Sequence, residues 1–167
     1  MTPPLASDPI AAASANWPRR EAVDAMAAAT SIMRAHQIVL SAVDTELRPM
    51  GLTFARFEVL RLLAFTRKGE LPMGKIGERL MVQPATVTNS VNRLESDGLV
   101  VRRSHPRDRR TILARITPKG RRLVERATEQ LDALRFGLAE LGTDDLRTLT
   151  AIIGDLREAV GDFETPR

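Results

Sequence analysis

A predicted helix over residues 84–96 presents a face of short polar side chains. Val87, Val91 and Leu94 recur at spacings of four and three, which buries one face and leaves the opposite face to solvent. Hydroxyl and amide groups of this length exchange hydrogen bonds with base edges in the DNA major groove, where each base pair has a distinct pattern. The residues expected at this surface are Gln83, Pro84, Ala85, Thr86, Thr88, Asn89, Asn92 and Arg93.

A basic segment over residues 104–110 follows this helix and contains Pro106, which is typical of a turn. Arginine is the favoured probe of a narrow minor groove, because its guanidinium is always charged and the groove has an enhanced negative potential. The segment therefore predicts a hairpin tip that contacts a DNA duplex. The residues expected to act there are Arg103, Arg107, Asp108, Arg109 and Arg110.

Positive charge is concentrated in the middle of the chain. Residues 72–126 hold thirteen Lys and Arg against five Asp and Glu, although the whole chain has a net charge of only +4. This uneven distribution favours a polyanionic partner for the middle of the chain. A solvated charged surface is the alternative interpretation of the charge alone.

Composition excludes several other kinds of chemistry. The chain has no cysteine, which excludes disulfides, thiolate metal sites and thiol-based sensing. Residues 69–75 match the start of a phosphate-binding loop, but Ile76 stands where Ser or Thr would hold magnesium. His36 and His105 fall on separate elements, so we expect no metal site. We also expect no cofactor and no enzymatic activity. Without a long apolar run or a secretory signal, we predict a cytoplasmic protein that has no membrane contact.

The elements that position these side chains are mainly helices. Apolar residues at helical spacing from Met26 to Leu47 predict one long helix, and Thr117 with Pro118 begins another. The prediction is a mobile tail over 1–18, helices over 19–48, 53–65, 73–80, 84–96 and 118–162 with an interruption at Gly142, and strands over 99–103 and 112–116. The expected fold class is mainly α with a small β-hairpin, as a winged helix-turn-helix with long N- and C-terminal dimerisation helices.

The expected organisation is a single domain over residues 19–167. Its winged helix-turn-helix covers 53–117, and its dimerisation helices cover 19–48 and 118–162. Three helices with long apolar seams are more than a chain of this length needs around its own core, so we predict a homodimer. Packing of these seams within one chain is the alternative.

From about residue 20 to 162 the chain resembles the multiple antibiotic resistance regulator (MarR) family. The resemblance rests on Asp108-Arg109-Arg110 and Ile116-Thr117-Pro118-Lys119-Gly120, preceded by Val87-Thr88 and Arg93-Leu94-Glu95. It implies a triangular homodimer that regulates transcription by binding a pseudo-palindromic DNA operator through two recognition helices. It also implies that Arg110 enters the minor groove while Asp108 orients it by an ion pair.

The resemblance further implies a repressor that a small aromatic or anionic effector releases from double-stranded DNA. The effector pocket is expected between the dimerisation helices and the DNA-binding lobe, where we place His36, Arg56, Phe57 and Phe65. The alternative function is a winged-helix module that binds another protein and no DNA, since a fold alone does not fix function. The basic hairpin tip argues against this alternative, because a protein-binding wing is expected to expose apolar residues.

Overall fold

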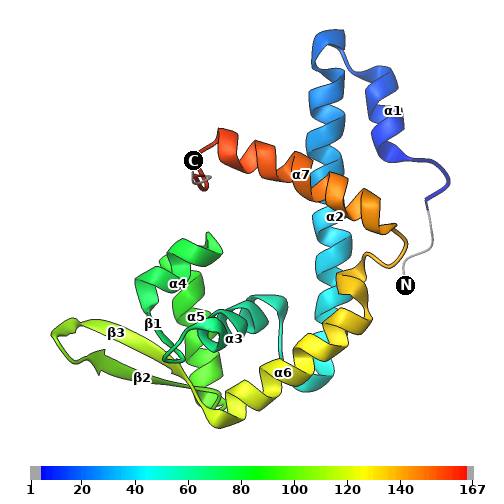
Figure 1. Cartoon of the computed structure of the whole chain (residues 1–167). Helices are drawn as coiled ribbons and strands as arrows, with labels where there is room; N and C mark the ends of the chain where they lie inside the picture. Colours follow the sequence, from blue (N-terminus) through cyan, green and yellow to red (C-terminus); the bar gives the residue numbers. More distant parts are fainter. Residues whose placement is uncertain (1–4, 165–167) are drawn as a thin grey trace.

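The chain folds into a winged-helix lobe over residues 54–116, joined to an arm of longer helices over residues 23–47 and 118–159 (Figure 1). The computed structural model describes residues 5–164, apart from the side chain of Arg109. The helices are α1 (Pro9–Asn16), η1 (Arg20–Ala22), α2 (Val23–Leu47), η2 (Arg48–Met50), α3 (Phe54–Phe65), α4 (Met73–Leu80), α5 (Pro84–Ser96), α6 (Pro118–Ala133), η3 (Arg135–Gly137) and α7 (Thr143–Ala159). The strands are β1 (Glu70–Pro72), β2 (Val100–His105) and β3 (Asp108–Ile116). Across the described residues, no helix combines the length and the apolar character needed to cross a membrane.

The three strands form one antiparallel sheet in the order β1-β3-β2. Strands β2 and β3 form the predicted hairpin, with Val100 opposite Ile116, and we call this hairpin the wing. The sequence did not predict β1, which pairs Glu70 with Arg115 and Pro72 with Leu113. Three residues ending in proline give no alternating pattern, and β1 exists because the β3 edge is available to pair with it. The predicted class, mainly α with a small β element, is confirmed.

The core lies where α3, α5, the sheet and α6 meet. Leu60, Leu63, Leu94 and Leu131 are completely buried there. Each such side chain stabilises the fold by about 1.5–3 kcal/mol relative to an exposed one. Gly120 lets α6 start against this core, because a Cβ at its position would collide with the Leu99 carbonyl oxygen. The buried contacts fix α5 and the hairpin relative to each other.

The N-terminal segment differs from the predicted mobile tail. Residues 9–16 form α1, which lies beside the N-terminal half of α2 (Figure 1). Asp8 caps this helix by accepting a hydrogen bond from the Ile10 amide at 2.9 Å, and Pro9 occupies its first turn. Aspartate followed by proline is a helix start signal, and the Ala-rich composition after it favours a helix.

The long C-terminal helix breaks earlier than the sequence predicted. Helix α6 ends at Ala133, well before Gly142, and Arg135 and Phe136 then adopt left-handed backbone with φ of 50° and 51°. Side chains with a Cβ rarely adopt this conformation, so Arg135 and Phe136 gave no sign of the break. Gly137, which follows with φ of 76°, was a signal that the prediction did not use. The break turns the chain toward α2, where Phe136 packs against the core. Helix α7 then starts after Gly142, as predicted.

Candidate nucleic-acid interface

A tight turn from α4 holds helix α5 at the surface. Met81, which follows α4, has a left-handed backbone with φ of 55°, and the Val82 amide donates back to the Gly77 carbonyl at 3.0 Å. A Cβ on Gly77 would lie 3.1 Å from the Val82 carbonyl oxygen, so a small residue suits this turn. Pro84 lies in the first turn of α5, where its missing N–H leaves no hydrogen bond unmade. Helices α4 and α5 therefore form a helix-turn-helix.

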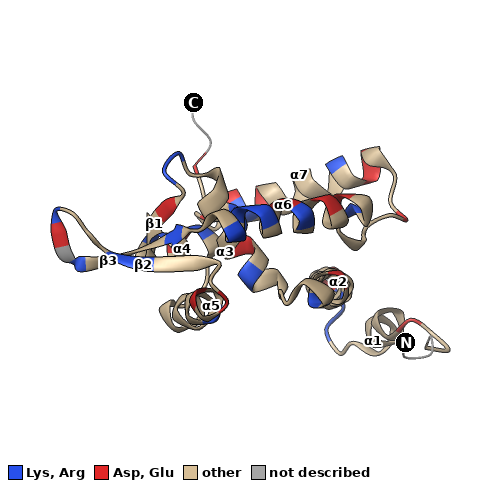
Figure 2. Cartoon of the chain, turned by 90° about the horizontal axis from the view of Figure 1, so that it is seen from below, with Lys and Arg blue, Asp and Glu red and all other residues tan. Residues whose placement is uncertain are grey.

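The outward face of α5 carries the polar residues that the sequence placed there. The predicted apolar residues are buried on its other face, and all eight predicted contact residues, from Gln83 to Arg93, are exposed. Thr88 already uses its hydroxyl proton, because its Oγ1 donates to the Pro84 carbonyl at 2.9 Å. In Figure 2, α5 lies at the lower edge of the lobe, seen nearly end-on, and the wing extends beside it with several Lys and Arg positions.

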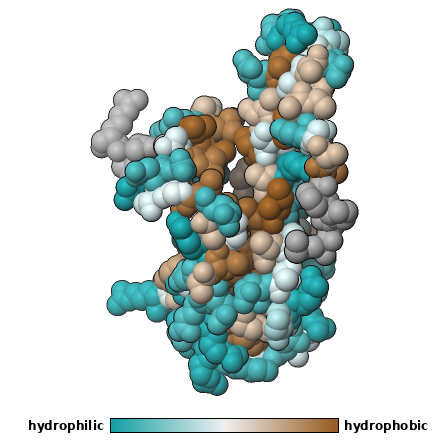
Figure 3. Space-filling view, turned by 90° about the vertical axis from the view of Figure 1, so that its right-hand side faces the viewer, coloured by the Kyte–Doolittle hydropathy of each residue, from teal (hydrophilic) through white to brown (hydrophobic). Residues whose placement is uncertain are grey.

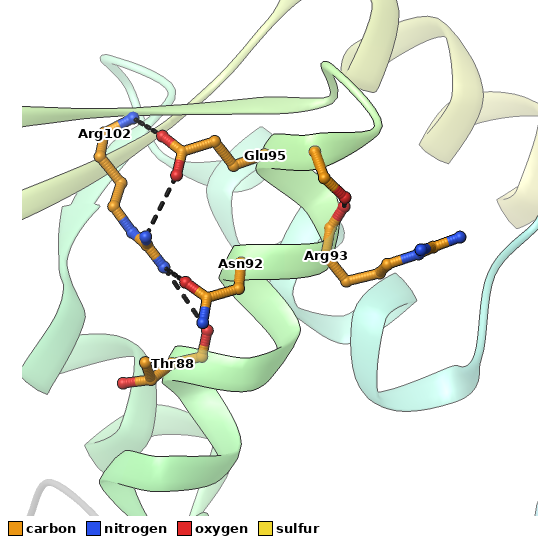
Figure 4. Close-up of polar contacts among 6 residues, drawn as sticks. Thr88, Asn92, Arg93, Glu95 and Arg102 are labelled. Carbon is orange, nitrogen blue, oxygen red and sulfur yellow. Dashed lines mark hydrogen bonds and ion pairs between the residues drawn. The ribbon is translucent and has the colours of Figure 1, made fainter.

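Arg102 joins strand β2 to α5 through four contacts (Figure 4). Its backbone N–H donates to Glu95 Oε1 at 3.0 Å, and its Nη1 donates to Glu95 Oε2 at 3.1 Å. Its Nη2 donates to Asn92 Oδ1 and, at 3.5 Å, to the Thr88 carbonyl oxygen. We call Thr88, Asn92, Glu95 and Arg102 the wing clamp.

The wing clamp changes the role expected of Asn92. The sequence predicted an amide directed at bases, but in the structure its carbonyl oxygen accepts a hydrogen bond from Arg102. Helical spacing gives the side of a helix on which a residue lies, and it does not give a partner from another element. The sequence did not single out Arg102 as a residue that organises this site, and the basic composition of the segment was its only signal.

The wing tip is organised differently from the predicted ion pair. Asp108 Oδ1 accepts from the Arg110 backbone amide at 3.0 Å, and Oδ2 accepts from Thr111 Oγ1 at 2.7 Å. These bonds from Thr111 and Arg110 hold the pKa of the Asp108 carboxyl below its ordinary value near 3.8. Within the described residues, Asp108 makes no ion pair with the Arg110 guanidinium. The prediction of that pair is therefore wrong, because a short carboxylate preferentially accepts from the backbone two residues ahead.

The predicted arginines of the wing fall into different environments. Arg107 and Arg110 are exposed at the tip, whereas the Arg109 side chain lies outside the described residues. Arg103 instead pairs with Glu70 of β1, whose side chain is only 10% exposed. The expectation that Arg103 contacts DNA assumed a free guanidinium, and its partner belongs to the strand that the sequence did not predict.

A hollow of about 850 Å³ separates the wing from α4 and α5. Its polar lining includes Lys75, Thr88, Arg102 and Arg110, and we call it the wing hollow. Lys75 lines this hollow and is a further candidate for binding a phosphate, although the sequence pattern did not single it out. Its Nζ lies 2.7 Å from Glu78 in an exposed pair, and such pairs contribute at most about 1 kcal/mol. A phosphate can therefore compete with Glu78 for this ammonium.

The four residues predicted to line an effector pocket lie in three different places. Phe57 and Phe65 line one apolar hollow of about 260 Å³. Arg56 lines a second hollow on the other side of α3, and His36 is exposed on α2 and lines neither. The predicted set therefore does not form one site in a single chain, because helix spacing alone does not show which faces of α2 and α3 meet.

The apolar hollow has a polar rim. Its lining is Phe54, Phe57, Glu58, Arg61, Leu62, Phe65, Leu80 and Phe136. The Arg61 guanidinium carbon lies 4.3 Å from the centre of the Phe65 ring, within the range of a cation–π interaction. Burial raises the pKa of the Glu58 carboxyl above its ordinary value. We call this site the aromatic hollow. Over residues 5–164, no group of three or more His, Asp or Glu residues is placed to hold a metal ion.

Comparison with known proteins gives consistent matches. Residues 50–111 match the model of the MarR family. The structure of Sco5413, a MarR family transcriptional regulator from Streptomyces coelicolor, is similar with a TM-score of 0.81 and 52% identity, covering 86% of this chain and 99% of that one. Sco3205 from the same organism, solved in complex with DNA, is similar with a TM-score of 0.71 and 25% identity, covering 78% of this chain and 83% of that one.

A curated relative agrees with these structures. The transcriptional regulator MhqR of Bacillus subtilis is 33% identical over 89 residues, which are 53% of this chain and 60% of the relative. The match therefore spans less than two thirds of the length of that relative. The family comprises transcriptional regulators and not enzymes, as the sequence predicted. The chain belongs to the MarR family of transcriptional regulators.

Proposed function

We propose that the chain is a sequence-specific repressor that binds double-stranded DNA as a homodimer on a pseudo-palindromic operator. The observation that carries this proposal is the exposed polar face of α5 directly beside the basic wing hollow. A helix about 10–12 Å wide fits a major groove about 12 Å wide. Cations next to the helix then face the phosphates along the groove. Contacts between such cations and phosphates supply most of the sequence-independent affinity for a duplex.

The rival function, a winged-helix module that binds protein and no DNA, is less consistent with the wing. Arg107, Asp108 and Arg110 are exposed at its tip, whereas protein interfaces are depleted of charge at their centre. The DNA complex of the related Sco3205 also supports a DNA-binding role. A regulator of this kind acts where the DNA is, so the proposal includes a cytoplasmic location.

The apolar surface of the arm supports a homodimer. Helix α7 has 17 residues and none of them is buried in the single chain. Exposed apolar residues of the arm include Ile32, Met33 and Ile38 of α2, Leu149, Ile152 and Leu156 of α7, and Val160 directly after α7. Figure 3 shows apolar side chains exposed in the upper half of one face, while the lower half is largely hydrophilic. A second copy of the chain would cover such a surface and present two α5 helices to successive turns of a duplex.

The aromatic hollow supports a response to a small aromatic anion. Phe54 and Phe57 of α3 and Phe136 of η3 supply its apolar wall, and Arg61 supplies a cation at the rim. The hollow joins the DNA-binding lobe to the break that follows α6. A ligand bound there would bias the angle between lobe and arm, and with it the spacing of the two α5 helices. This revises the predicted site, keeping Phe57 and Phe65 and leaving out His36 and Arg56.

A mobility-shift titration with the DNA that flanks the chain's own gene tests the proposal. We expect one retarded species whose mass equals two chains per duplex, with an unrelated duplex at least about a thousandfold weaker. Equal affinity for both duplexes would show that the chain binds DNA without sequence preference. Absence of any shift, with a folded chain, would favour the protein-interaction module.

A further inference from the structure

We propose that Arg48, Arg56 and Arg93 form a second phosphate-binding site, which grips the DNA strand on the side of α5 opposite the wing. The three arginines line a hollow of about 560 Å³ together with Asp44, Gly51, Leu52 and Thr53. We call this the flank hollow. The inference rests on the proposed function, because it needs α5 to lie in a major groove.

The flank hollow and the wing hollow lie on opposite flanks of the exposed face of α5. Thr88 lines the wing hollow and Arg93 lines the flank hollow. These residues are five positions apart in sequence, which corresponds to about 140° around the axis of an α-helix. Viewed down that axis, Ala85 and Asn89 lie in the sector between them. Figure 4 shows Arg93 extending from the side of α5 opposite Arg102, toward the cyan ribbon.

The geometry of the duplex gives each flank a backbone to contact. A major groove about 12 Å wide is bounded by one sugar-phosphate backbone on each side, and a helix with its side chains is about as wide as the groove. When the face that carries Ala85 and Asn89 is turned to the bases, the two hollows therefore approach different backbones. The wing hollow supplies cations for one of them, and the flank hollow supplies cations for the other.

The flank hollow is built on rigid backbone. The turn after α2 is fixed by hydrogen bonds from the Gly51 amide to the Arg48 carbonyl at 2.9 Å and from the Leu52 amide to the Leu47 carbonyl at 3.2 Å. Gly51 has the left-handed φ of 72° that this helix end requires. Arg56 is half-buried, and its Nε donates to Thr53 Oγ1 at 3.2 Å, which directs the guanidinium along the wall.

The acids near the flank hollow are already engaged. Asp44 Oδ1 accepts a short hydrogen bond of 2.6 Å from the Phe54 amide at the start of α3. That helix end is thus capped from within the chain, and the arginines are the groups that remain to bind an anion. Asp97 pairs with Arg93 at 3.3 Å, but the Arg93 side chain is 66% exposed, so the pair contributes little and a phosphate can replace it.

The test measures how operator binding depends on salt in Arg48→Gln and Arg56→Gln. Each variant removes one phosphate contact from each subunit of the dimer, so we expect the slope of log affinity against log salt to fall by about two. Operator and unrelated duplex should weaken by the same factor. Arg48→Lys keeps the charge and should keep most of the slope, and Arg147→Gln on α7 is a matched control that should leave binding unchanged.

Ethylation interference then locates the contact. In the wild type we expect interference at a phosphate across the major groove from the one sensed by Arg110, and Arg48→Gln should abolish it. Unchanged slopes and unchanged interference in both glutamine variants, with normal melting curves, overturn the flank hollow while DNA binding by α5 and the wing survives. A loss of preference at one base pair also overturns it, because it would show base readout. If the wild type binds no duplex, the proposed function fails first.

Discussion

Arg102 and Glu95 bind each other twice, through the Arg102 amide at 3.0 Å and its guanidinium at 3.1 Å. The first contact fixes the backbone of β2, and the second carries the guanidinium over α5 to Asn92. The wing and the recognition helix are thus joined by side chains as well as through the core. In the proposed DNA complex, their relative position would set which phosphate the wing reaches.

A double-mutant cycle on Arg102→Ala and Glu95→Ala measures this connection. The two side chains are 28% and 38% exposed, so we expect a coupling of about 1 kcal/mol in the free energy of unfolding. The control is the i,i+3 pair of Lys75 and Glu78 on α4, whose side chains are 56% and 64% exposed, and we expect it to contribute about 0.2–0.5 kcal/mol. Equal coupling in both cycles, from chemical denaturation, would mean that the wing clamp adds nothing beyond a surface ion pair.

Asn89 and Asn92 should behave differently although both are exposed on α5. We expect Asn89→Ala to lose about 1–3 kcal/mol of discrimination at one base position in each half-site. Asn92→Ala should instead weaken all duplexes slightly, because it removes the acceptor for Arg102. Binding to a series of operators with single base changes separates the two. A base-specific loss in Asn92→Ala, with none in Asn89→Ala, would contradict this assignment.

The hydrogen bonds that Asp108 accepts at the wing tip should be lost only at low pH, when its carboxylate is protonated. The folded pKa of Asp108 is lowered by its hydrogen bonds from Thr111 and Arg110, so these bonds stabilise the tip above the ordinary pKa and are lost as pH falls through the folded value. We expect the NMR shift of the Arg110 amide to stay constant at neutral pH and to titrate with a midpoint below 3.8. Asp108→Ala should remove this titration. A midpoint above the ordinary value would show that the bonds do not favour the charged carboxyl.

The sequence was sufficient for features that depend on local spacing. Val87, Val91 and Leu94 placed the buried side of α5 correctly, and Thr117 with Pro118 gave the start of α6, where Thr117 accepts from the Gly120 amide at 3.0 Å. These signals depend on residues within one or two helical turns, so they do not depend on the tertiary contacts of the rest of the chain.

The sequence was insufficient for features that depend on contacts between distant segments. The clamp from Arg102 to Asn92, the pair of Arg103 with Glu70 and the strand β1 all need elements that meet only in the folded chain. The left-handed backbone at Phe136 is likewise imposed by packing, because a residue with a Cβ rarely adopts this conformation. The separation of His36 from Phe57 has the same origin.

The apolar face of α7 gives a direct test of the homodimer. Ile152 is 61% exposed in the single chain, and a charge at this position would be buried in the proposed interface. We expect Ile152→Glu to give monomers in sedimentation and to lose operator binding. Ala151→Glu, about 100° around the helix and farther from the apolar stripe, is the control and should stay dimeric. A dimeric Ile152→Glu that binds the operator normally would place the interface elsewhere.

We propose that α5 reads the base sequence while the wing contributes positive charge, and the Arg110→Ala variant separates these two roles. The measurement is the dissociation constant for an operator selected from random DNA and for a scrambled duplex, over a range of salt concentrations. We predict that the wild type prefers the operator by at least about a thousandfold. Arg110→Ala should weaken both duplexes by the same factor and lower the slope of log affinity against log salt by about two, one for each subunit of the dimer. A wild type that does not distinguish the two duplexes, or an Arg110→Ala variant with an unchanged slope, would contradict the account.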